Sequence, residues 1–493
     1  MVRLDRYDGL DLASYRRIVA GGEELEVSDD LLAEVERRRD ALLRHLATGA
    51  AAYGVTTGLG YLAKVPVGEA EQEALQRSML TARASGLGSP LPADVVRGAM
   101  LLRLTGFLSG FAGVSAALCR FLLERLNAGW SPIVPAGPYG AAGEIAPLAH
   151  LFQTFLGEGS MDVGGEIVAA GEALRKAGVA PYEPGPKEGL ALVNGSPFAT
   201  ALAIHLGDRG RRLLERSLLA AALTLELTGV TARPYAERVA ALSGDGPEQM
   251  ASAALRELLG AGAATAGPQP SVSFRVVGQV LGALGRTLDE LEATAERRLR
   301  SVTDSPLFLE EAPGEAEGLY PSGGFHALEA TLRVEAVAVA VAHATNLAEK
   351  HLHRLLDGRF SGLPEQLAAE PGRQAGAVSL HKAVVSLTAA NRLLAAPASV
   401  HALDTSSGQE DVQAHTFLAT ARLSEALDNH ELALAYGFVA LCQAAYLRGA
   451  TPTAPMLAGA IERLTSAVAP IDEDRTLSPD VERVVALLRE GHL

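Results

Sequence analysis

Several polar side chains with catalytic potential stand in glycine-rich segments of this chain. Tyr53 begins YGVTTGLG, Asn194 lies in LALVNG, and Glu410 lies in SSGQED. A tyrosine oxygen can accept a proton when nearby cations or donors stabilise its anion. A carboxylate can accept a ring N–H, whereas the planar guanidinium of a residue such as Arg275 suits bidentate binding of a carboxylate. These residue types are suited to acid–base chemistry and to binding carboxylates and N–H groups.

Each of these residues also has a simpler structural interpretation. Asn194 precedes a glycine, and Asn-Gly pairs form turns. Arg275 is compatible with a helix-surface arginine paired with Glu290, and Glu410 with a buried salt bridge. YGVTTGLG resembles a phosphate-binding loop only superficially, because it lacks the GxxxxGK[ST] pattern. Nucleotide binding is therefore not expected.

Two lysines are further candidates. Lys64 follows Tyr53 in the same segment, where its charge could favour the tyrosine anion, although a surface lysine is the commoner case. Lys382 interrupts the apolar stripe of SLHKAVVSL, where an ammonium is costly unless it faces a site or a partner chain. The nearby histidines show no metal-ligand spacing with an acid or a cysteine, so no metal is expected at His326, His381 or His415.

Long stretches with helical spacing of apolar residues must position these loops. A first helix is expected from Asp29 to Thr48, with Ser28 as its N-cap, and helices again within residues 69–127. A Pro/Gly-rich loop at 131–143 precedes a short stranded region at 161–180. Later helices are expected at 196–227, 246–262, 273–301, 324–356, 375–394, 411–449 and 453–467. Several exceed 25 residues, which favours an elongated bundle.

The fold expected is therefore mainly α, with a loop-rich N-terminal domain at 1–195 and a central helical bundle with C-terminal helices at 196–493. The 493 residues carry a net charge of -15, so nucleic-acid binding is not expected. The two cysteines lie in apolar runs, which fits reduced thiols and a cytoplasmic protein. Neither a signal peptide nor a membrane-spanning run is expected.

Four motifs in order along the chain resemble the histidine/aromatic amino-acid ammonia-lyase family. They are YGVTTGLG, GAAGEIAPLAH at 140–150, LALVNG and SSGQED, with weaker matches in VTDSPL, GGFHA and PASV. The resemblance implies a homotetramer with a central bundle of long helices and active sites shared between subunits. It also implies an electrophilic methylidene-imidazolone, which the family forms by cyclising and dehydrating an Ala-Ser-Gly tripeptide.

The corresponding tripeptide here is Ala141-Ala142-Gly143. Ala142 has no β-hydroxyl to eliminate, so the methylidene cannot form and no cofactor is expected. Either an ordinary lyase was inactivated by an engineered substitution, or the chain diverged naturally. Other departures favour divergence: Arg83 stands where histidine ammonia-lyases have histidine, and Val272 replaces an active-site tyrosine.

The resemblance also implies roles for individual residues. Tyr53 matches the catalytic base, and Arg275 matches the clamp of the substrate carboxylate. Lys64 and Lys382 are the further catalytic candidates named above. The substrate-binding set implied by the resemblance is Arg83, Asn194, Gln269, Arg275, Phe325 and Glu410. Glutamate at position 410 accompanies imidazole substrates in the family. Tyr53, Arg275 and Glu410 are expected to converge only across subunits.

A site without the electrophile could still expel a group that departs as a neutral amine. The expected function is β-elimination by a carbon–nitrogen lyase on an amino-acid-like, histidine-derived substrate. The release of trimethylamine from a betaine such as ergothioneine, as in ergothionases, is the specific expectation. The alternatives are an inactive histidine ammonia-lyase homologue, engineered or natural, and an amino-acid-binding pseudoenzyme.

Overall fold

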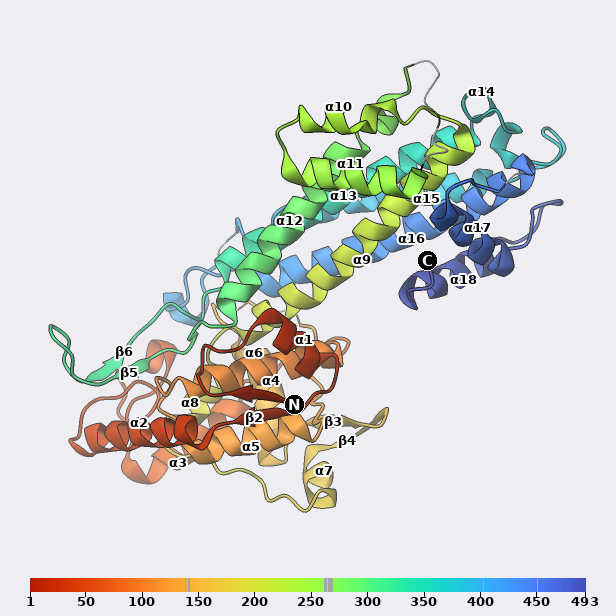
Figure 1. Cartoon of the computed structure of the whole chain (residues 1–493). Coiled ribbons are helices and arrows are strands. Elements are labelled where there is room, and N and C mark those ends of the chain that lie inside the picture. The colour runs from red at the N-terminus through yellow and green to blue at the C-terminus, as the bar shows by residue number, and fades with distance from the viewer. Residues whose placement is uncertain (138, 141, 261–263, 265–268, 402, 450) are drawn as a thin grey trace. The chain divides into compact units, whose positions relative to one another are not determined.

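A computed structural model describes residues 1–493 except 138, 141, 261–263, 265–268, 402 and 450 (Figure 1). The described chain forms two compact units. Unit 1 comprises Met1–His205, Glu292–Leu332 and Ala398–Thr420, and unit 2 comprises Leu206–Leu291, Arg333–Pro397 and Ala421–Leu493. Sequence analysis placed a single division at residue 195, whereas unit 1 also includes two segments from the later part of the chain. Those segments carry Phe325 and Glu410.

Unit 1 holds the helices of the N-terminal part of the chain. They are α1 (Leu12–Val19), α2 (Asp29–Ala47), α3 (Glu69–Thr81), α4 (Ala93–Leu108), α5 (Ala116–Asn127), α6 (Ile145–Phe152), α7 (Ala170–Lys176) and α8 (Glu188–Val193). The helix expected at 29–48 is confirmed as α2, but it is not the first helix, because α1 precedes it. The Ser28 hydroxyl caps α2 by accepting the Leu31 N–H at 3.4 Å. Strands were expected at 161–180. The first part of this region is stranded, but α7 occupies the second part.

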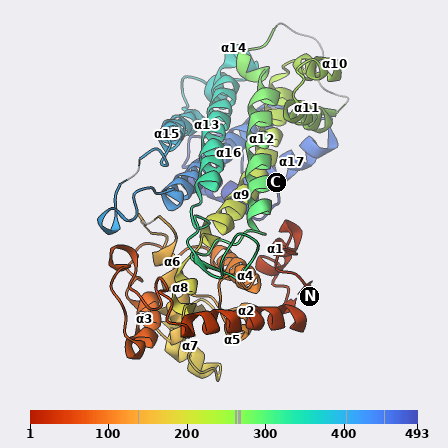
Figure 2. The same ribbon diagram turned by 90° about the vertical axis from the view of Figure 1, so that its left-hand side faces the viewer.

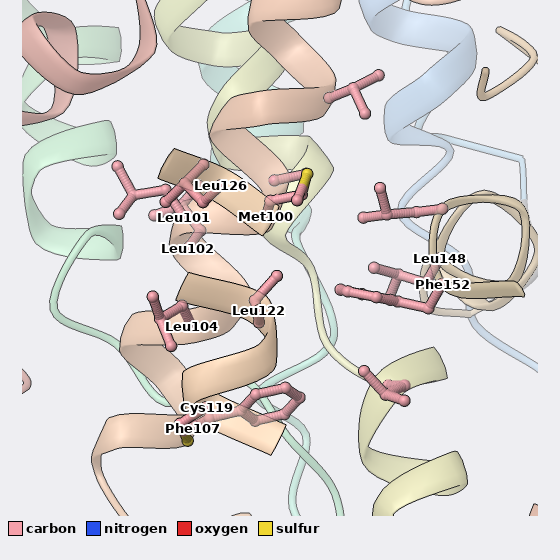
Figure 3. Close-up of a cluster of buried hydrophobic side chains, with 14 of the residues drawn as sticks. Met100, Leu101, Leu102, Leu104, Phe107, Cys119, Leu122, Leu126, Leu148 and Phe152 are labelled. Atoms are coloured by element: carbon pink, nitrogen blue, oxygen red, sulfur yellow. The ribbon is translucent and has the colours of Figure 1, made fainter. Parts of the chain in front are cut away.

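Helix α4 is the centre of the unit 1 core. Its sequence is apolar on all sides, which is typical of a helix surrounded by other elements. Met100, Leu104 and Phe107 on α4 are 0% exposed and belong to the same buried cluster as residues of α5 and α6. Figure 3 shows these side chains with Leu122 of α5 and Phe152 of α6. This core anchors the helices from which the loops of interest emerge.

Small sheets complete unit 1. Within the described residues they are three two-stranded sheets: β1 (Val2–Leu4) parallel to β2 (Leu25–Val27), β3 (Ser160–Val163) antiparallel to β4 (Glu166–Ala169), and β5 (Leu307–Leu309) antiparallel to β6 (Gly318–Tyr320). The mainly α fold is thus confirmed.

Unit 2 contains most of the length of the long helices. Four helices contain the unit boundaries: α9 (Pro197–Thr228), α12 (Val277–Arg298), α13 (Leu328–Leu356) and α16 (Thr416–Arg448). The others are α10 (Glu237–Ala241), α11 (Gly246–Leu259), α14 (Gly358–Ser361), α15 (Val378–Leu394), α17 (Pro455–Ala467) and α18 (Ser478–Arg489). The expected long helices are confirmed to within a few residues at each end. In Figure 2, α12, α13 and α16 run side by side in this unit.

A buried polar network joins the long helices of unit 2. His430 on α16 is 0% exposed and hydrogen-bonds Ser217 of α9 at 2.9 Å and Thr345 of α13 at 3.0 Å. Asn391 of α15 donates to Thr345 at 2.9 Å and to the Ala426 carbonyl of α16 at 3.0 Å. Buried polar groups with every partner in place fix the register of packed helices.

One helical stretch, Glu188–Thr228, is long and apolar enough to cross a membrane among the residues that the structure describes. However, 89% of its most apolar window is buried inside the chain, as in the core helix of a globular protein. Cys119 and Cys442 are both buried and unbridged, as their apolar surroundings predicted.

Candidate active site

Tyr53 lies in a turn that a glycine and a buried glutamine hold in place. Gly54 has a φ of 67°, and a Cβ there would lie 2.8 Å from the Leu190 side chain. Buried Gln76 of α3 donates to the Gly54 carbonyl oxygen at 2.8 Å. Tyr53 is 38% exposed, and its hydroxyl oxygen accepts the Gly60 N–H at 2.8 Å. The tyrosine is accessible, and a donor that stabilises negative charge already contacts its oxygen.

Arg83 is the cation that interacts with Tyr53. Burial lowers the pKa of the half-buried Arg83, and the Tyr53 oxygen acts in the opposite direction. Lys64 is exposed and makes no hydrogen bond or ion pair with any residue that the structure describes. The proposed influence of Lys64 on Tyr53 therefore stays a prediction, whereas Arg83 has a physical link to the tyrosine.

Glu410 links its own loop to the degenerate tripeptide. Its Oε2 atom accepts the Ala142 N–H at 2.9 Å and the Thr405 hydroxyl at 3.3 Å, while Oε1 accepts the Ser406 hydroxyl at 3.2 Å. Ser406 and Ser407 both adopt left-handed backbone conformations, with φ of 51° and 55°, in the short 3-10 helix η7 (Ser406–Gly408). Such conformations are uncommon for serine and cluster at functional sites.

The Tyr53 and Glu410 loops meet within unit 1. The 3-10 helix η1 (Gly60–Leu62) packs against η7, and a Cβ on Gly60 would lie 3.9 Å from the Ser406 Cβ. The expectation that Tyr53, Arg275 and Glu410 converge only across subunits is therefore wrong for Tyr53 and Glu410. Sequence separation concealed this, because over 300 residues lie between two loops that the fold brings together.

A small open hollow adjoins the tripeptide, and Ala142, Gly143 and Phe325 are among the residues that line it. A Cβ on Gly143 would be in van der Waals contact with the Phe325 side chain at 3.5 Å, which places that ring next to the loop. Tyr139 and Phe417, which also line the hollow, contact each other edge to face with ring centroids 4.9 Å apart. Ala141 lies outside the described residues.

Glu144, which sequence analysis did not single out, caps the helix that follows the Asn194 loop. Its two carboxyl oxygens accept the N–H groups of Phe198 and Ala199, both at 2.6 Å, at the start of α9. Burial raises the pKa of Glu144 to about 8, against the effects of those N–H donors and of Arg298. An acid directly after the tripeptide and before an apolar run was the available sequence signal.

A fully buried charge cluster supports the same loops and was also missed. Asp304 faces Arg103 at 3.3 Å and Lys187 at 3.5 Å, and all three side chains are at most 2% exposed. Arg103 also donates to the Ala191 carbonyl at 3.0 Å, and Lys187 donates to the Ala112 carbonyl at 2.9 Å. The motif VTDSPL contains Asp304, but sequence alone did not identify its partners.

Asn194 ends α8 beside this cluster. Its side chain donates to the Ser305 carbonyl oxygen at 2.7 Å, which fixes the start of the loop to the neighbouring segment. Gly195 has a φ of 109°, and a Cβ there would lie 2.9 Å from a guanidinium nitrogen of Arg103. The hydrogen bond to Ser305 gives Asn194 a structural role. Its contact with substrate stays a prediction.

The remaining candidates belong to unit 2. Arg275 follows the 3-10 helix η5 (Val272–Phe274), and its buried Nε has no hydrogen-bond partner among the described residues. Glu290, the partner expected for a purely structural arginine, instead pairs with Arg333 at 2.6 Å. Gln269 and Lys382 are exposed. Lys382 therefore does not carry the burial cost that the apolar stripe suggested.

The chain belongs to the aromatic amino acid lyase family, whose model matches residues 10–468. It is 32% identical to the histidine ammonia-lyase of Symbiobacterium thermophilum over 98% of this chain and 96% of that protein. It is 35% identical to the histidine ammonia-lyase of Aromatoleum aromaticum over 96% of this chain and 91% of that protein. Membership in this family makes the protein a carbon–nitrogen lyase.

Solved structures give the same family and fold. Ergothionase from Treponema denticola, an ergothioneine-degrading enzyme, matches with a TM-score of 0.94 and 25% identity over 99% of both chains. Histidine ammonia-lyase from Trypanosoma cruzi matches with a TM-score of 0.88 and 26% identity over 100% of this chain and 94% of that one.

The tripeptide does not fit the electrophile that the family forms from Ala-Ser-Gly. Dehydration needs a side-chain hydroxyl at the central residue, and Ala142 offers a methyl group. Cyclisation would also turn the nitrogen of the central residue into a ring nitrogen without a proton. In the uncyclised chain the Ala142 N–H donates to Glu410 at 2.9 Å, a hydrogen bond that a ring nitrogen without a proton could not make. No step of the reaction is therefore assigned to a methylidene-imidazolone.

Proposed function

We propose that this lyase eliminates trimethylamine from a histidine-derived betaine such as ergothioneine, without a methylidene-imidazolone and without a metal. The observation that carries the proposal is Ala142 in the place of the cofactor serine, in a loop whose neighbours Tyr53 and Glu410 are positioned together. A site with these groups retains a base and a ring-binding carboxylate after losing its electrophile.

The leaving group explains why no electrophile is needed. A quaternary trimethylammonium has no lone pair to add to a methylidene, and it departs as a neutral amine. Tyr53 takes the proton from the carbon next to the ring, the electrons of that C–H bond form the new double bond, and the C–N bond breaks. Proton, electrons and leaving group balance without a further reactant.

The contacts of Tyr53 support its role as the base. The Gly60 N–H donates to the phenol oxygen at 2.8 Å, and the half-buried guanidinium of Arg83 lies near enough to interact with that oxygen electrostatically. The same Arg83 suits a sulfur-bearing or anionic ring substituent better than a cationic imidazole. Lys64 is assigned at most an indirect effect.

Arg275 and Glu410 are proposed to hold opposite ends of the substrate. The unpaired Nε of Arg275 fits a guanidinium that binds a carboxylate from outside the described chain. Glu410 accepts donors from its own loop and from Ala142, and the remaining lone pairs of the carboxylate can accept a ring N–H. We infer a cytoplasmic homotetramer whose shared sites bring Arg275, Gln269 and Lys382 to the other residues.

The likeness to an ergothioneine-degrading enzyme supports this substrate class. The higher identity to histidine ammonia-lyases favours a second candidate, an inactive homologue that still binds histidine. Turnover of a betaine distinguishes the two candidates, because an inactive homologue releases neither trimethylamine nor ammonia.

The deciding experiment measures trimethylamine released from ergothioneine and from its sulfur-free analogue, and ammonia released from histidine. The wild type should release trimethylamine and no ammonia. Tyr53→Phe should lower kcat by about 10²–10⁴-fold with little change in binding, as for the loss of a general base. The matched control is Tyr61→Phe, because Tyr61 is 70% exposed in the adjoining η1 segment. Equal rates in wild type and Tyr53→Phe would remove Tyr53 from the mechanism.

Ala142→Ser tests the cofactor argument. The serine alone should not produce ammonia-lyase activity, because Arg83 and Val272 also differ from the family. The measured mass of the intact wild-type protein should equal the mass calculated from its sequence, with no loss of water from cyclisation or dehydration. Ammonia release from histidine by Ala142→Ser at an ordinary enzymatic rate would instead identify an inactivated histidine ammonia-lyase.

A further inference from the structure

Two histidines and a glutamate meet on adjacent helices of unit 2. Glu349 and His353 are four residues apart on α13, which places them on the same face of the helix. His381 of α15 reaches the same point, and one ligand atom from each residue lies within 4.8 Å of the others. Figure 2 shows α13 beside α15. Sequence spacing did not predict this cluster, because two helices contribute to it.

The carboxylate of the cluster is buried and the imidazoles are accessible. The Glu349 side chain is 5% exposed, whereas that of His381 is 23% exposed and His353 is exposed. Glu349 accepts the His381 Nε2 hydrogen bond at 2.7 Å, and the two imidazole rings stack with centroids 4.8 Å apart. In the single chain the two imidazoles are therefore open to solvent, and the carboxylate is already oriented by its hydrogen bond.

A third histidine on α13 shows by contrast what a structural histidine looks like here. His351 is 5% exposed, its Nε2 contacts the Ser273 carbonyl oxygen at 2.9 Å, and its ring stacks on Phe274. Its nitrogen is engaged by backbone and its ring by an aromatic neighbour. His353 is instead exposed, and its ring stacks on the second imidazole of the cluster, His381.

We propose that Glu349, His353 and His381 form a binding site for one divalent transition-metal ion such as Zn²⁺ or Co²⁺. Two imidazole nitrogens and one carboxylate oxygen are a ligand set that these ions accept, with water completing the coordination. The ion takes the place of the proton shared between His381 and Glu349, and it joins α13 to α15. Lys350, whose ammonium contacts Glu349 at 2.6 Å, neutralises the carboxylate in the metal-free protein.

The test is metal titration of the full-length, untagged protein after removal of metals with a chelator. Co²⁺ binding is followed by its visible absorption and Zn²⁺ binding by calorimetry. We expect one equivalent of Co²⁺ per chain, with visible bands of nitrogen and oxygen ligation. His353→Ala and His381→Ala should each weaken binding at least about tenfold, the lower end of the losses seen when metal sites are disturbed.

His343→Ala is the matched control, because His343 is exposed on the same helix but outside the cluster. It should bind Co²⁺ and Zn²⁺ as the wild type does. Glu349→Gln is a second variant of similar shape, which keeps the test valid if an alanine variant folds poorly. No saturable binding by the wild type would overturn the proposal, as would unchanged affinity in a well-folded His353→Ala or His381→Ala.

Discussion

Unit 1 contains two groups of polar residues that are built in opposite ways. In the Tyr53 and Glu410 loops the functional side chains are accessible or partly buried, and each accepts a backbone N–H. Two serines beside Glu410 have a left-handed backbone conformation. The cluster of Arg103, Lys187 and Asp304 is almost completely excluded from water and is bound to backbone carbonyls of surrounding segments.

The difference shows how this fold separates stability from chemistry. Accessible groups can bind and release protons or ligands, but each contributes little to the free energy of unfolding. Removing one member of a buried ion pair lowers the free energy of unfolding strongly, because the other charge stays buried without a partner. Variants in the two groups should therefore fail in different assays.

The largest expected effect is on stability, from Asp304→Asn. Removing the only acidic partner described for Arg103 and Lys187 leaves two buried cations, and such losses cost about 3–5 kcal/mol. The measurement is the free energy of unfolding in guanidinium chloride at one fixed protein concentration. Asp5→Asn, which breaks an exposed pair with Arg3, is the matched control and should leave that free energy unchanged. A similar midpoint for both variants would contradict the comparison.

The next effect is a pH dependence that originates at Glu144. Its pKa of about 8 in the folded chain exceeds the ordinary glutamate value, so the folded state keeps a proton that the unfolded state has lost. Stability should therefore fall as pH rises from about 4.5 to 8, by at most about 1.4 kcal/mol per pH unit for one proton. Glu144→Gln should remove this slope in unfolding experiments at pH 5, 6, 7 and 8. A slope unchanged by the substitution would show that other groups cause it.

A smaller effect is expected from Glu410→Gln, and it should appear in ligand binding. The glutamine amide oxygen can still accept the Ala142 N–H, but it is a weaker acceptor than a carboxylate for a ring N–H. Binding of thioimidazole or imidazole ligands should weaken roughly tenfold to a hundredfold, since hydrogen bonds to charged groups contribute about 1.5–3 kcal/mol. Phenyl ligands of the same length are the control and should bind as before. Equal losses for both ligand types would assign Glu410 to loop structure alone.

The smallest effect should be that of Tyr53→Phe on stability. The variant loses one hydrogen bond to a side chain that is 38% exposed, so the free energy of unfolding should change by less than about 0.5 kcal/mol. The measurement is the same guanidinium unfolding curve. A change as large as that of Asp304→Asn would make Tyr53 part of the supporting structure.

The long helices could be predicted because each carries its own apolar periodicity, and the start of α2 could also be predicted from its cap, Ser28. The site residues could be named only through their motifs. The meeting of the Tyr53 and Glu410 loops depends on packing between η1 and η7, for which neither segment carries a local signal.

The buried groups were the least predictable. The sequence does not reveal the partners of Lys187 and Arg103, whose complete burial is explained by their approach to Asp304 and to backbone carbonyls. His381 has no acid at ligand spacing in its own helix, because Glu349 comes from α13. Long-range pairs of this kind are set by the fold, so residue type and local spacing do not reveal them.

The hydrogen bond from Gly60 to the Tyr53 oxygen also provides a spectroscopic probe. An amide proton shared with a phenol oxygen changes its NMR chemical shift when that oxygen gains or loses charge. Labelling glycine with ¹⁵N would therefore report, at a single backbone position, whether the tyrosine holds its proton before and after a ligand binds. The state of the base could then be followed without any turnover.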